Sequence, residues 1–127
     1  MRIRRTPAAV AVAIGLAVAV APAALAKDGD VRARGTCTKN AISKLKLSDE
    51  NGRIEVEFEV DQNRNGVPWK VTLRRNGSLV ASTTATTRGP SGSFEVRRVI
   101  SRSAGGSRVV GTAKSPSGET CTVRARF

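Results

Sequence analysis

Hydrophobic and polar residues alternate strictly from Arg53 to Asp61, and this is the clearest pattern in the chain. The apolar positions are Ile54, Val56, Phe58 and Val60, and the positions between them carry Glu55, Glu57 and Glu59. A period of two residues predicts a β-strand with one buried and one solvated face, as in an antiparallel sheet. We therefore expect the three glutamates to share a wet outer face.

Seven further segments combine the same kind of alternation with turn residues at their ends. They are Val31–Thr38, Ile42–Ser48, Pro68–Arg75, Leu79–Thr87, Phe94–Ile100, Arg108–Lys114 and Thr120–Phe127. Asn51-Gly52 and Asn76-Gly77 are typical of tight hairpin turns. The weak apolar face of Leu79–Thr87 predicts an edge strand. No segment keeps a helical period, so we predict one all-β domain of seven or eight antiparallel strands, as a two-sheet sandwich or a closed sheet, and favour the sandwich.

The order of the strands suggests which side chains meet. If Arg53–Asp61 pairs with Pro68–Arg75, the glutamates face Lys70 and Arg74 across the sheet, and such pairs help to fix register. Trp69 lies on an early central strand and resembles the core tryptophan of immunoglobulin-like and fibronectin-III-like sandwiches. The cysteines depart from the antibody pattern, because they would join the first and last strands. The resemblance therefore concerns an architecture and implies no function.

The first 26 residues have the composition of a secretory signal peptide. Arg2, Arg4 and Arg5 precede the apolar run from Ala8 to Val20, and Ala24-Leu25-Ala26 fits a cleavage site. The alternative, a membrane anchor, is disfavoured by Pro22 and by the dominance of Ala and Val. We expect cleavage to leave a domain of residues 27–127 with no transmembrane segment, located outside the cell or in its envelope. The Arg-, Ala- and Val-rich composition favours a bacterial source.

The two cysteines, Cys37 and Cys121, are separated by 84 positions. In an exported chain an even number of cysteines indicates a disulfide. We predict that this bond closes a loop of nearly the whole domain.

The residues that are missing exclude several chemistries. The chain contains no His and no Tyr, so triads based on histidine and histidine–metal sites are ruled out. Glu55, Glu57 and Glu59 are spaced about 6.5–7 Å apart along a solvated strand face, which does not fit the carboxylate pair of a glycosidase. We expect a protein that is not an enzyme and needs no cofactor or metal.

The net charge is +12, and three of the 22 basic residues fall in the predicted signal peptide, which leaves +9. If the first and last strands pair antiparallel with Cys37 opposite Cys121, Arg34 faces Arg124 and Arg32 faces Arg126. Four arginines without an acid would then form an anion-binding patch. Parallel pairing would remove this alignment, and solvated arginines that only confer solubility are the alternative.

Two functions follow as expectations. The first is a monomeric, secreted binding domain, associated with the cell envelope, whose partner is an anionic cell-wall polymer. The second is an inhibitor of an extracellular hydrolase, a protein partner that would be engaged through Arg88–Gly92 or Gln62–Gly66 as an exposed loop.

Overall fold

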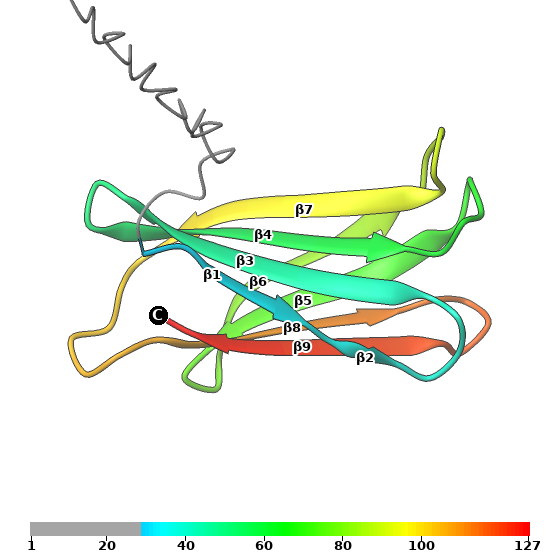
Figure 1. The fold of residues 1–127 in the computed structure, drawn as a ribbon. Coiled ribbons are helices and arrows are strands. Elements are labelled where there is room, and N and C mark those ends of the chain that lie inside the picture. The colour runs from blue at the N-terminus through cyan, green and yellow to red at the C-terminus, as the bar shows by residue number, and fades with distance from the viewer. Residues whose placement is uncertain (1–28) are drawn as a thin grey trace, which may run out of the picture.

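The computed structural model describes residues 29–127, which form two antiparallel β-sheets (Figure 1). The predicted signal peptide lies outside the described residues. One sheet has four strands in the order β1-β3-β4-β7, namely Val31–Arg34, Ile42–Glu50, Arg53–Asp61 and Ser93–Ile100. The other has five in the order β2-β9-β8-β5-β6, namely Thr36–Cys37, Thr120–Arg126, Arg108–Lys114, Pro68–Arg75 and Ser78–Thr86. The predicted all-β class is confirmed for this part of the chain.

Within residues 29–127 there is no helix with the length and apolar character needed to cross a membrane.

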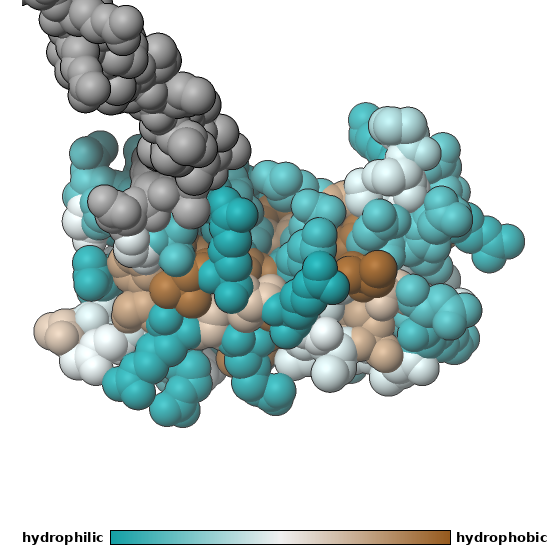
Figure 2. All heavy atoms as spheres, viewed as in Figure 1, coloured by the Kyte–Doolittle hydropathy of each residue, from teal (hydrophilic) through white to brown (hydrophobic). Residues whose placement is uncertain are grey.

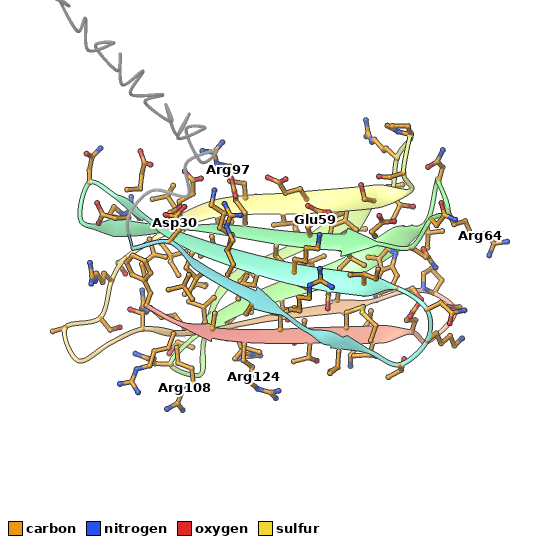
Figure 3. The ribbon with its side chains drawn as sticks, in the orientation of Figure 1. Asp30, Glu59, Arg64, Arg97, Arg108 and Arg124 are labelled. Carbon is orange, nitrogen blue, oxygen red and sulfur yellow. A yellow bond between two sulfur atoms is a disulfide. The ribbon has the colours of Figure 1, made fainter. Side chains whose placement is uncertain are left out.

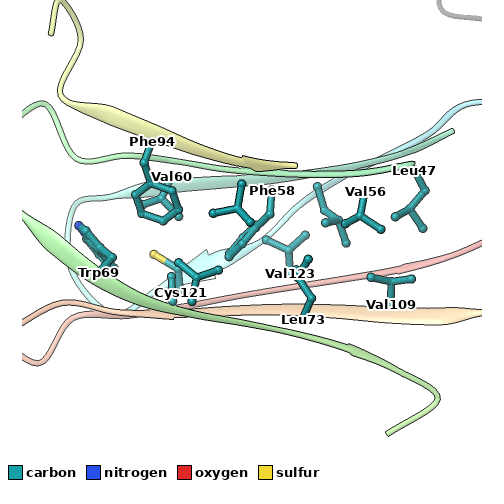
Figure 4. Close-up of a cluster of buried hydrophobic side chains, with 14 of the residues drawn as sticks. Leu47, Val56, Phe58, Val60, Trp69, Leu73, Phe94, Val109, Cys121 and Val123 are labelled. Carbon is teal, nitrogen blue, oxygen red and sulfur yellow. The ribbon is translucent and has the colours of Figure 1, made fainter. Parts of the chain in front are cut away.

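The inward faces of both sheets meet in one hydrophobic core (Figure 4). Trp69 is fully buried, as predicted, and its indole nitrogen donates a hydrogen bond to the side-chain oxygen of Gln62 at 3.2 Å. The ring of Phe94 packs against both Trp69 and Phe58, with centroids 6.1 and 6.3 Å away. Each large apolar side chain buried in this way contributes about 1.5–3 kcal/mol. Figure 2 shows apolar side chains still visible between hydrophilic ones on the side where β1, β2 and β9 lie.

The predicted pairing of Arg53–Asp61 with Pro68–Arg75 is wrong. β4 pairs with β3 and β7, whereas β5 lies in the other sheet between β6 and β8. The hairpin between β3 and β4 turns at Asn51 and Gly52, whose φ angles of 52° and 81° are those of the predicted tight turn. The loop that follows β4 carries the chain across to the second sheet. Leu79–Thr87 was expected at an edge, and β6 is indeed an edge strand.

The first predicted strand, Val31–Thr38, is divided at Gly35 between the two sheets. A Cβ atom at Gly35 would lie 2.3 Å from the carbonyl oxygen of Thr122, so only glycine fits where the chain passes this close to β9. β1 therefore pairs with β3, and β2 pairs with β9. This division raises the number of strands in residues 29–127 to nine.

The predicted disulfide is present, with Cys37 directly opposite Cys121 on β2 and β9. The register deduced from it holds for Thr36 and Thr122 but ends at Gly35.

Candidate functional site

The structure places the four arginines of the predicted patch on two different sheets. Arg124 and Arg126 lie on β9, whereas Arg32 and Arg34 pair with Lys46 and Lys44 of β3. The predicted pairs Arg34–Arg124 and Arg32–Arg126 are not formed, because the chain changes sheets at Gly35. In Figure 3 the labelled Arg124 points away from the five-stranded sheet, on the opposite side of the molecule from Glu59 and Arg97.

Arg124 and Arg126 belong instead to a larger cluster on the outer face of the five-stranded sheet, which we call the basic face. Its cations alternate with buried or half-buried residues along β5, β8 and β9, and all of them are exposed. They are Lys70, Arg74, Arg108, Lys114, Arg124 and Arg126. The five strands of this sheet contain no Asp or Glu. Within the described residues no ion pair reaches any of the six cations.

A row of hydroxyl side chains crosses the middle of the basic face. Successive strand registers align one residue from each of the five strands, in the order Thr36, Thr122, Thr112, Thr72 and Ser82. On one side of this row Lys114 pairs with Lys70, and on the other Arg124 and Arg74 flank Val110. Lys70 and Arg74 are four residues apart, so the cation rows are separated by about 13 Å. The result is a row of hydrogen-bonding groups between two lines of positive charge.

The outer face of the four-stranded sheet has a different electrostatic character. Arg97 on β7 forms an ion pair with Glu55 at 2.6 Å and a longer one with Glu57 at 4.0 Å. The hydrogen bond from Arg97 to Glu55, supported by the attraction of that carboxylate, raises the pKa of the guanidinium. Glu55 is only 8% exposed, which contradicts the expectation that all three glutamates of β4 are solvated. Lys46 pairs with Glu57 at 3.5 Å and with Asp30 at 3.8 Å.

An open depression of about 540 Å³ lies on this second face. Its cationic side is formed by Arg32, Arg34, Lys44 and Lys46 of β1 and β3. Its other side is formed by carboxylates of β4 and β7, so charges of both signs line the same hollow.

The two loops predicted as inhibitory segments pack against each other at one end of the molecule. Gln62 N donates to Gly92 O at 3.0 Å, and Gly66 N donates to Thr87 O at 2.7 Å. The buried hydroxyl of Thr87 donates to Arg64 O at 2.6 Å. In Figure 3 the side chain of Arg64 projects from this end of the molecule. Arg88 O accepts hydrogen bonds from Gly92 and Ser93, at 2.9 and 3.2 Å.

Four members of the basic face were not among the predicted site residues, namely Lys70 and Arg74 of β5 and Arg108 and Lys114 of β8. The alternation alone indicates that these four side chains face outward, because each occupies a position between inward-facing residues of its strand. The sheet order that brings these strands beside β9 was not available from the pattern.

Comparison with protein-family models, curated proteins and solved structures gave no match.

Proposed function

We propose that this chain is exported and acts as a non-enzymatic binding domain that engages an anionic polymer of the cell envelope through the basic face. The single observation that carries the proposal is the set of six exposed cations on one sheet face whose strands contain no acidic residue. Guanidinium groups bind phosphate, sulfate and carboxylate oxygens through paired hydrogen bonds. Threonine hydroxyls between the cations add donors and acceptors for a polar chain.

The excess of positive charge is concentrated on one sheet and is not spread evenly over the protein. The strands of the four-stranded sheet carry seven basic and seven acidic residues, whereas those of the five-stranded sheet carry seven basic and none acidic. A field concentrated on one face orients a polyanion during its approach and raises its rate of association.

The absence of His and Tyr from the sequence supports a non-enzymatic role, since both cysteines are used in the disulfide. The disulfide also supports export, because such bonds persist in oxidising compartments. The partner would be a wall polymer with phosphate, sulfate or carboxylate groups.

An immunoglobulin-like or fibronectin-III-like architecture remains part of the proposal. Its support is Trp69 on an interior strand and the order β6-β5-β8-β9, in which two hairpins meet through β5 and β8. The departure from that pattern lies at the edge of the four-stranded sheet, where β1 adds a strand beside β3.

The second candidate, inhibition of an extracellular hydrolase, is favoured by the hydrogen bonds that hold the two loops together. A protease inhibitor that binds in the manner of a substrate presents a main-chain carbonyl to the oxyanion hole of the enzyme. The carbonyl oxygens of Arg64 and Arg88 instead accept hydrogen bonds from within the loops. This geometry disfavours cleavage-site mimicry at either arginine, and we therefore prefer the anionic partner.

Binding to immobilised long-chain inorganic polyphosphate tests the proposal. The variant K70Q/R108Q/R124Q removes three cations from the basic face, and the control R64Q/R88Q/R98Q removes three exposed cations outside that sheet. We expect the first variant to bind at least about tenfold more weakly and with a shallower salt dependence, because fewer counterions are released. The control should lose less than about threefold.

Equal losses in the two variants would mean that net charge alone governs retention, and the basic face would have no special role. Unchanged binding in K70Q/R108Q/R124Q would overturn the proposal directly.

A further inference from the structure

The four-stranded sheet carries two neighbouring rows of charged residues, and only one of them contains ion pairs among the described residues. The strand registers align Arg32, Lys46, Glu57 and Arg97 in one row, which we call the paired row. They align Arg34, Lys44, Glu59 and Glu95 in the next, which we call the open row. Three members of the paired row form ion pairs within 4 Å, whereas among residues 29–127 no ion pair involves any member of the open row.

The open row also places like charges directly opposite each other. Glu59 on β4 faces Glu95 on β7, and Arg34 on β1 faces Lys44 on β3. Like charges in such cross-strand positions are destabilising. A single cation over the two glutamates and a single anion over the two basic residues would relieve both repulsions at once. All four side chains line the depression of about 540 Å³ described above.

The spacing of the row sets the size of the molecule that fits it. Adjacent strands lie about 4.8 Å apart, so the midpoint of the glutamate pair and the midpoint of the basic pair are separated by about 10 Å. An extended chain of three residues spans about 10 Å. At neutral pH a free peptide carries an ammonium group at one end and a carboxylate at the other.

We propose that the open row binds a short extended peptide of about three residues by its two free ends. The amino terminus lies between Glu59 and Glu95, and the carboxylate lies between Arg34 and Lys44. A volume of this size is typical of sites for small ligands. This site is on the opposite sheet from the basic face and does not depend on it.

Titration of the isotope-labelled protein with trialanine, followed by amide chemical shifts, tests the inference. Two compounds serve as controls. N-acetyl-trialanine amide lacks both terminal charges, and free alanine carries an ammonium group and a carboxylate that are too close together to reach both ends of the row. We expect trialanine to shift the amides of the open row and to bind about fivefold to tenfold more tightly than either control. Comparable shifts for the three compounds, or shifts centred on another surface, would overturn the proposal.

Two variants separate the site from general charge effects. E59Q/E95Q should abolish the response to trialanine, whereas D49N/E50Q, with the same change in net charge at the β3–β4 turn, should retain it. E95K places a cation opposite Glu59, so it should block the peptide and raise the melting temperature. Retention of trialanine binding by E59Q/E95Q or by E95K would contradict the assignment.

Discussion

Glu119 illustrates how one side chain in a turn can organise a distant loop. It lies between β8 and β9, is 3% exposed, and one carboxylate oxygen accepts hydrogen bonds from the main-chain nitrogens of Lys39 and Ala41, each at 3.0 Å. Lys39 Nζ also donates to Ser117 O at 3.0 Å. The turn between β8 and β9 therefore holds the loop between β2 and β3 beside the disulfide.

Replacement of Glu119 by alanine is expected to reduce the free energy of unfolding by about 2–3 kcal/mol, because two main-chain donors lose a charged acceptor. E119Q is the matched control, since one amide oxygen can still accept both hydrogen bonds, and its loss should be about half as large. Urea unfolding followed by tryptophan fluorescence of Trp69 measures both. A stability of E119A within about 0.5 kcal/mol of the wild type would show that the carboxylate is not needed here.

Individual residues differ in how far the sequence predicts their role. The turn at Asn51-Gly52 and the burial of Trp69 follow from local chemistry and strand alternation, and both are confirmed. Glu119 carries no such signal, because its partners are about 80 positions away. Glu55 was misjudged for a related reason: its exposure depends on Arg97 of β7, a strand whose position beside β4 the alternation does not reveal.

Strand alternation identifies which face of a strand is buried, but it does not assign the strand to a sheet. β4 and β5 have the same pattern and are joined by a short loop, yet they belong to different sheets. Two consecutive strands bury the same alternate residues whether they pair as a hairpin in one sheet or lie in the two stacked sheets of a sandwich. For this reason the strands themselves were predictable, whereas the pairing of β4 and the division of the first strand were not.

The division of the first strand between the two sheets can be tested at Gly35. A Cβ atom there would lie 2.3 Å from Thr122 O and Val123 Cγ2 and 2.5 Å from Ser43 Oγ. G35A must therefore push the first strand away from β9 or β3, and we expect a loss of about 2–4 kcal/mol in unfolding free energy.

Gly105 provides the control, because nothing lies within 4 Å of a Cβ atom built there. Denaturant titration of G35A and G105A in parallel compares them. If the two variants proved equally stable, the close crossing at Gly35 would be ruled out.

At the scale of the whole molecule the two sheets divide the charge between them. The strands of one sheet carry equal numbers of acidic and basic residues, whereas the outer face of the other holds six cations that form no ion pair within residues 29–127. The sequence predicted a basic surface and the involvement of Arg124 and Arg126. It placed Arg32 and Arg34 on the wrong sheet, because a register inferred from one disulfide cannot foresee a crossing two residues away.

The disulfide joins β2 to β9 within the five-stranded sheet and closes a loop of nearly the whole domain, so its removal is expected to affect the entire domain. β2 has only two residues and is paired only with β9, at the position where Cys37 meets Cys121. A covalent loop of 84 residues lowers the entropy of the unfolded chain by an amount worth up to about 4.5 kcal/mol at 25 °C. C37A/C121A should therefore lose about 3–4 kcal/mol, measured as a lower urea midpoint together with a changed slope, since the unfolded chain becomes less compact. Reduction of the wild-type protein should reproduce the loss, and the same reductant should leave C37A/C121A unchanged. A double variant that unfolds at the wild-type midpoint would show that the strand contacts alone fasten β2 to β9.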